Sequence, residues 1–153
     1  MKVTFKHRAD YYFWAFALVV MVKGLLQYVI TEDTCVLNIG DTYYVASGLH
    51  VSLFNTTVLL IIGLLYTGLY ATGVPLFKKL TKLHTAGSMM VFIAAWIILP
   101  LLKNYFRATL FDIPWYTDVD VVRTLLIVAF MLVQFLLLIN ATIGIIKKLK
   151  AGN

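Results

Sequence analysis

Long apolar runs separated by short polar segments dominate the pattern along this chain. Four runs are long enough to cross the hydrocarbon core of a bilayer, which takes roughly 20 helical residues. They are continuous and rich in Leu and Ile, without the alternation of membrane β-strands, so the pattern predicts helices. The four predicted spans cover about residues 11–30, 49–73, 83–102 and 121–146.

Composition supports the same interpretation. Of 153 residues, 61% are hydrophobic and only 13% are charged, far from the balance of a soluble domain. We therefore expect an all-α integral membrane protein, a four-helix up-down-up-down bundle. The connections are too short for a soluble domain, so residues 1–153 are expected to form a single transmembrane domain. The longest connections, about residues 31–48 and 103–118, are expected to be external loops.

The positive charges indicate orientation. Most of them precede the first span, separate the second from the third, or follow the fourth: Lys2, Lys6, Arg8; Lys78, Lys79, Lys82; Lys147, Lys148, Lys150. The positive-inside rule then predicts that both termini are cytoplasmic, in the inner (cytoplasmic) membrane. The net charge of +6 is explained by this orientation and by anionic lipid of the bilayer, and nucleic acid is not expected as a partner.

Polar side chains inside the predicted spans are few, and each is a functional candidate because burial in lipid is costly. Asn55, Gln134 and Asn140 are interpreted as hydrogen-bonding partners between helices. Lys23 lies ~18 Å into the first span, at ~1.5 Å per residue. It either extends to the external surface or contacts a haem propionate or a quinone oxygen. No acidic residue falls within any predicted span.

Two histidines, His50 and His84, stand at the start of the second and third spans. Consecutive spans are antiparallel, so the two lie at opposite membrane faces and cannot share one metal ion. As axial ligands they would serve two b-type haems, because imidazole is a common haem ligand. His7 would complete the site of His84. His50 would need a neighbouring subunit, a twofold-related copy or a different side chain. The alternative is that both imidazoles contact lipid head groups or neighbouring helices.

The stretch from about residue 49 to 90 resembles the membrane subunits of nickel-iron hydrogenases and formate dehydrogenases, which are prokaryotic b-type cytochromes. Those proteins typically read histidine, apolar helix, Thr-Gly, loop, then Leu-His with a glycine soon after. The matching positions are His50, Thr67, Gly68, Pro75, Leu83, His84 and Gly87. The resemblance implies that His50 and His84 ligate haem. That family also supplies histidines from a later helix, whereas the fourth span here has none.

The leading hypothesis is a small membrane cytochrome b subunit. It would carry electrons through one or two haem b groups between a quinone pool and a partner in a larger complex. The alternative is a haem-free accessory subunit, and a small transporter is a third possibility. The partners are other membrane subunits or a homodimer mate. We find no nucleophile, carboxylate pair or phosphate-binding Gly-rich loop, so independent hydrolase or transferase activity is not expected, although an oxidoreductase complex would include such a subunit.

Overall fold

The computed structural model describes residues 8–31, 34–39, 42–99 and 116–152. This part of the chain contains four helices that are long and apolar enough to cross a membrane, which confirms the expectation of four such helices. The spans agree with the predicted ones to within a few residues at most ends. They are Ala9–Ile30, Gly48–Ala71, Lys78–Ile98 and Leu125–Ala151.

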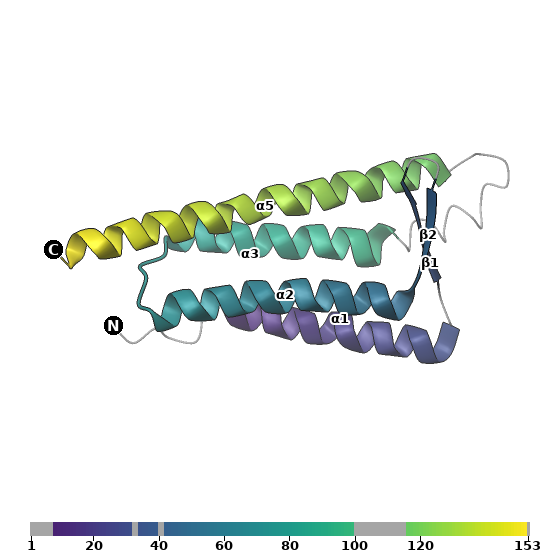
Figure 1. The fold of residues 1–153 in the computed structure, drawn as a ribbon, viewed down its shortest axis with the longest axis horizontal. Helices are drawn as coiled ribbons and strands as arrows, with labels where there is room; N and C mark the ends of the chain where they lie inside the picture. The colour runs from purple at the N-terminus through teal and green to yellow at the C-terminus, as the bar shows by residue number, and fades with distance from the viewer. Residues whose placement is uncertain (1–7, 32–33, 40–41, 100–115, 153) are drawn as a thin grey trace. The chain divides into compact units, whose positions relative to one another are not determined.

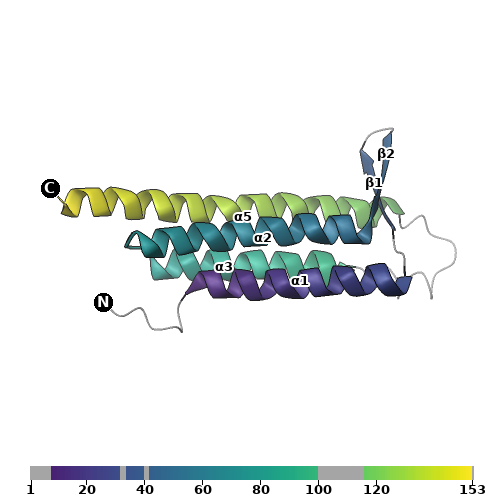
Figure 2. The same cartoon turned by 60° about the horizontal axis from the view of Figure 1, so that its bottom comes forward.

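The chain divides into two compact units, Met1–Gly73 and Val74–Asn153. In the first unit, helix α1 (Ala9–Thr31) packs against helix α2 (Gly48–Ala71). Figure 1 shows these two helices side by side, and Figure 2 shows the same pair after a turn of 60°. Phe13 stacks on Tyr66 with ring centroids 5.8 Å apart, whereas Gly24, further along α1, meets Ser52 near the start of α2. The pair is therefore antiparallel.

Small residues allow the backbones of α1 and α2 to approach closely. A Cβ atom added at Gly24 would lie 2.2 Å from Ser52 Cβ, far inside van der Waals contact. One at Gly63 would lie 2.4 Å from the Trp14 indole ring. Such contacts are typical of membrane helices, where close packing replaces the hydrophobic effect as the force that holds helices together.

A β-hairpin connects α1 to α2, where we expected only a loop. Strand β1 (Thr34–Ile39) pairs antiparallel with β2 (Thr42–Ser47), from Thr34 opposite Ser47 to Ile39 opposite Thr42. Both segments are rich in β-branched or aromatic residues, TCVLNI and TYYVAS, which favour strands. Gly and Asp separate them in the sequence, a two-residue hairpin signal that the hydropathy pattern obscured.

The second unit pairs helix α3 (Lys78–Ile93) with helix α5 (Tyr116–Ala151). A π-helical turn, η2 (Ala94–Ile98), continues α3, and the Leu99 N–H donates to the Ala94 carbonyl five residues earlier. The rings of Phe92 and Phe130 meet edge-on with their centroids 5.4 Å apart, and the Phe77 N–H donates a hydrogen bond to Asn140 Oδ1. Helices α3 and α5 are therefore also antiparallel (Figure 1).

Helix α3 begins at Lys78, five residues before the predicted span, so Lys78, Lys79 and Lys82 are helical and not in a loop. The segment before it is held against α5. Asn140 Oδ1 accepts from the Phe77 N–H at 2.8 Å, and a Cβ added at Gly144 would lie 2.6 Å from Val74 Cγ1. Hydropathy along the sequence cannot predict these contacts, because both partners, Asn140 and Gly144, belong to another helix.

Candidate functional site

His50 is the third residue of α2, and Ser47 caps this helix. Ser47 Oγ accepts from the His50 backbone N–H at 3.3 Å and lies 2.5 Å from His50 Nδ1. A hydroxyl oxygen has two lone pairs. In the tautomer with its proton on Nδ1, the ring therefore donates to Ser47 and presents the lone pair of Nε2. His50 is exposed, so this nitrogen is accessible to a further partner.

His84 has a different environment. It lies in the second turn of α3 and is 0% exposed. Its Nε2 is 2.9 Å from Gln134 Oε1 on α5. The Gln134 amide donates in turn to Ser88 Oγ at 3.3 Å and to the Phe130 carbonyl at 3.1 Å. His84 is thus part of a polar network that joins α3 to α5, as the Gln134 interpretation expected.

Asn140 forms a second link between α3 and α5. Its amide donates to Thr81 Oγ1 at 2.9 Å and to the Phe77 carbonyl at 3.4 Å, and it is 0% exposed. The interpretation of Asn140 as a partner between helices is confirmed. Asn55 is different, because its amide donates to the Val51 carbonyl of its own helix at 2.6 Å.

Of the other two candidate residues, the structure describes Lys23 but not His7. His7, and with it the proposed pairing of His7 and His84, lies outside the described residues. Lys23 is half-buried on α1 and lines a shallow groove of about 500 Å³ together with Gln27. The rest of the groove is formed by Leu, Val and Ile side chains of the same helix. An apolar groove with one ammonium suits an apolar ligand that carries an oxygen acceptor.

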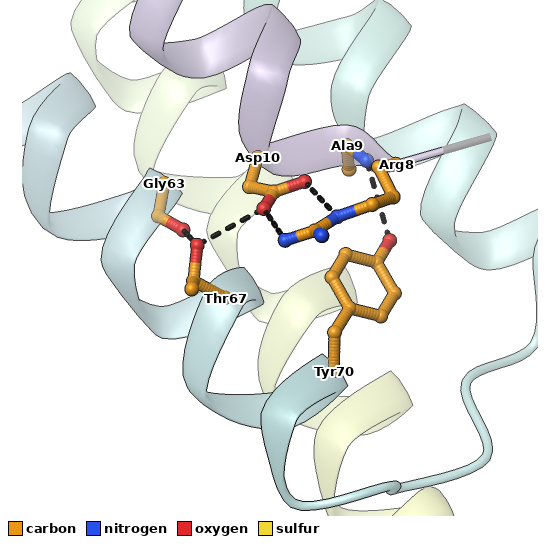
Figure 3. A network of polar contacts seen from close by, with 6 residues as sticks. All are labelled: Arg8, Ala9, Asp10, Gly63, Thr67 and Tyr70. Atoms are coloured by element: carbon orange, nitrogen blue, oxygen red, sulfur yellow. Dashed lines mark hydrogen bonds and ion pairs between the residues drawn. The ribbon is translucent and has the colours of Figure 1, made fainter. Parts of the chain in front are cut away.

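The structure also reveals a polar network that the sequence analysis missed (Figure 3). Helix α1 begins two residues before the predicted span, which places Asp10 in its first turn, 0% exposed. Arg8 forms an ion pair with Asp10, and Thr67 Oγ1 of α2 lies 3.0 Å from Asp10 Oδ2. Tyr70 Oη accepts from the Ala9 N–H at 3.3 Å. An acidic residue therefore does lie within a span, contrary to expectation.

The charges in this network compensate one another. The hydrogen bond to Asp10 raises the pKa of the Arg8 guanidinium above its ordinary value. The same guanidinium lies 4.7 Å from the ring centroid of Tyr11 and 5.5 Å from that of Tyr70, within the range of cation–π attraction. The signal in the sequence was the acid between Arg8 and the aromatic run YYFW, which hydropathy averages conceal.

The two histidines fit a haem unequally. His50 has the arrangement usual for a metal-ligating imidazole, in which one ring nitrogen is held by a neighbour while the other faces the metal. His84 does not fit as it lies, because Gln134 occupies its Nε2 and its ring is enclosed. Within the described residues, no group of three or more His, Cys, Asp or Glu side chains could hold a metal ion.

Comparisons with known proteins add no relative: no family model, no curated protein and no solved structure matches this chain.

Proposed function

We propose that this protein is a small membrane subunit that holds haem b through His50 and serves electron transfer within a larger complex. The observation that carries the proposal is the Ser47–His50 contact of 2.5 Å at the start of a membrane-spanning helix. The resemblance of residues 49–90 to hydrogenase and formate dehydrogenase cytochromes supports the same residue.

The residues of this chain have a limited role in such a site. When bound, haem supplies reversible one-electron chemistry. His50 Nε2 would bind the haem iron, and Ser47 would hold the orientation and the tautomer of the imidazole through Nδ1. The second ligand would come from another subunit or from the His50 of a twofold-related copy, because a closed dimer repeats each residue across its axis.

On this proposal His84 pairs α3 with α5 and does not bind haem, so each chain would hold one haem and not two. The bond to Gln134 would have to break before Nε2 met iron. The groove that contains Lys23 and Gln27 would accept a quinone, whose ring is apolar and whose carbonyl oxygens accept hydrogen bonds. This groove belongs to α1, the helix that packs against the His50 helix α2.

The proposed setting follows the distribution of lysines. An up-down-up-down arrangement in the cytoplasmic membrane, with both termini cytoplasmic, places nine of the basic residues on the inner side. His50 would then lie near the external surface. Its haem would exchange electrons with an external partner.

A second candidate function is a haem-free accessory subunit of a membrane complex. The observation that favours it is the bond of the fully buried His84 to Gln134, a polar contact that serves helix packing and not chemistry. On this alternative His50 would contact lipid head groups or a neighbouring subunit, and the chain would stabilise a larger complex through its apolar surfaces.

Absorption spectroscopy separates the two functions. We expect protein purified from haem-supplemented cells to show a Soret band and a reduced-minus-oxidised α band. His50→Ala should remove both bands, whereas His84→Gln should retain them and serves as the matched histidine control. Ser47→Ala should keep the haem but shift its midpoint potential, because the Nδ1 partner tunes the basicity of the ligand.

Circular dichroism and gel filtration must show that each variant is folded and monodisperse. A folded wild-type preparation without a Soret band, even after haem is added in detergent, would reject the haem function and leave the accessory function. Loss of the bands in His84→Gln alone would reject the assignment of His50.

A further inference from the structure

One end of the α3–α5 pair collects lysines from two distant parts of the sequence. Because α3 and α5 are antiparallel, the start of α3 lies beside the end of α5, as the contacts of Phe77 with Asn140 and Lys147 require. Six lysines belong to these two helix ends, and all are exposed: Lys78, Lys79, Lys82, Lys147, Lys148 and Lys150. We refer to them as the lysine cluster.

Specific contacts bring the two halves of the lysine cluster together. Asn140 holds the backbone of Phe77, the residue before Lys78. Lys147 Nζ lies 4.7 Å from the centroid of the Phe77 ring, within cation–π distance. The proximity therefore results from fixed packing between α3 and α5 and not from chance extension of long side chains.

The lysine cluster has no acidic residue near it on these helices. Among the described residues of this unit, the acids are Asp118 and Asp120, both in the first turns of α5. At ~1.5 Å per residue, Asp120 and Lys147 are about 40 Å apart along the helix axis. This separation exceeds the ~30 Å hydrocarbon core, so these two acids belong to the end of α5 opposite the lysine cluster.

Apolar side chains are interleaved with the lysines. Phe77 is 39% exposed, Ile146 48% and Leu149 66%. An aliphatic lysine stem beside such side chains places its ammonium at the level of lipid phosphates while the stem stays in the apolar layer. An exposed surface that is both apolar and cationic matches a phospholipid better than a soluble acidic protein or a nucleic acid.

We propose that the lysine cluster binds the head groups of anionic phospholipids at the bilayer surface. Each lysine near such a surface adds to the attraction, and the attraction decreases with salt. The inference is independent of haem, because it rests on residues of α3 and α5 only, so its failure would leave the proposed function untouched.

The test measures lipid selectivity of the full chain reconstituted in phosphatidylcholine bilayers. Trace amounts of spin-labelled phosphatidylglycerol or spin-labelled phosphatidylcholine are added, and electron paramagnetic resonance reports the fraction held at the protein. We expect a preference of about threefold for the anionic lipid in low salt, falling towards onefold in about 1 M NaCl. The K147Q/K148Q/K150Q variant should lose most of this preference at low salt.

Two controls make the result specific. The K147R/K148R/K150R variant keeps the charges and should keep the preference. The K2Q/K6Q/K103Q variant removes the same number of charges outside the lysine cluster and should also keep it. If circular dichroism shows that K147Q/K148Q/K150Q does not fold, the inference is tested by the salt series on the wild type and by the lipid preference of K2Q/K6Q/K103Q.

Three outcomes would overturn the inference: equal retention of both labelled lipids by the wild type, an unchanged preference in K147Q/K148Q/K150Q, or an equal loss in K2Q/K6Q/K103Q. Displacement of the labelled lipid by inorganic phosphate, beyond that by NaCl of equal ionic strength, would also overturn it. The surface would then be a site for free phosphate.

Discussion

His84 Nε2 lies 2.9 Å from Gln134 Oε1, and this contact joins two residues that are 50 positions apart in the sequence. The imidazole is fully buried between them, so the hydrogen bond satisfies a group that would otherwise be costly to enclose. A residue that the sequence presents as a haem ligand is in this fold a partner in helix pairing.

The first prediction concerns this contact. Gln134→Leu should destabilise the protein by about 1 kcal/mol, the usual size of hydrogen bonds between membrane helices. His84→Leu should cost a similar amount, and the double variant should cost less than the sum, because either change alone breaks the same bond. Reversible unfolding in mixed micelles measures all three, and strict additivity would contradict a direct interaction.

A second prediction concerns the close approach of α1 and α2. Gly24→Ala should destabilise the protein by about 1–3 kcal/mol, the range for overpacking, because the new Cβ would lie 2.2 Å from Ser52 Cβ. Ser52→Gly in the same chain should recover part of the loss. Gly68→Ala is the control, since an added Cβ there meets nothing within 4 Å. Equal effects at both glycines would contradict a role for the contact, because the gain in helix propensity from Gly to Ala is the same at both positions.

The Asp10 network provides a third prediction. Thr67→Val should cost about 0.5–1 kcal/mol through loss of one hydrogen bond, and Asp10→Asn should cost more, because the ion pair with Arg8 is lost as well. Unfolding of each variant against wild type tests this order, and a larger loss in Thr67→Val would contradict it.

The pH dependence of the same network has a definite sign. The pKa of Arg8 is raised in the folded protein, so the stabilisation from its charge is complete below the unfolded pKa and is lost only as pH rises through the folded pKa. Even in the unfolded chain a guanidinium stays charged well above neutral pH. We therefore expect the difference between wild type and Arg8→Gln to stay constant from about pH 6 to about pH 10. A difference that shrinks steadily over this range would contradict the result.

A further prediction concerns the segment before α3. Asn140→Leu should destabilise the protein by about 1–2 kcal/mol, because the Phe77 N–H loses its acceptor and Thr81 loses a donor. Thr142→Ala, on the exposed side of α5, is the matched control and should stay within about 0.5 kcal/mol of wild type. Hydrogen exchange at Phe77 should accelerate in Asn140→Leu only.

The helices themselves were predictable because membrane insertion depends on the length and polarity of each run, both of which are local properties. The residues at which the helices begin and end were less predictable. Helix α3 begins at Lys78 because Asn140, more than 60 residues away, holds Phe77, and no hydropathy window contains that partner.

The candidate site divides in the same way. The contact of His50 is local in the sequence, because its capping partner Ser47 is three residues away. The contact of His84 is not local, since it depends on Gln134 of another helix. Asp10 was overlooked because it lies one residue before the predicted span. Its ion pair with Arg8 is local, whereas its contact with Thr67 arises only when α1 meets α2.

By itself, then, the sequence determined that this is a protein of four membrane helices, because about 20 apolar residues in a row have no favourable alternative to lipid or a buried core. Tertiary structure alone decided which polar side chains meet. Hydrogen bonds and ion pairs require a partner within about 3 Å, and only the antiparallel packing of each helix pair brings partners on different helices that close.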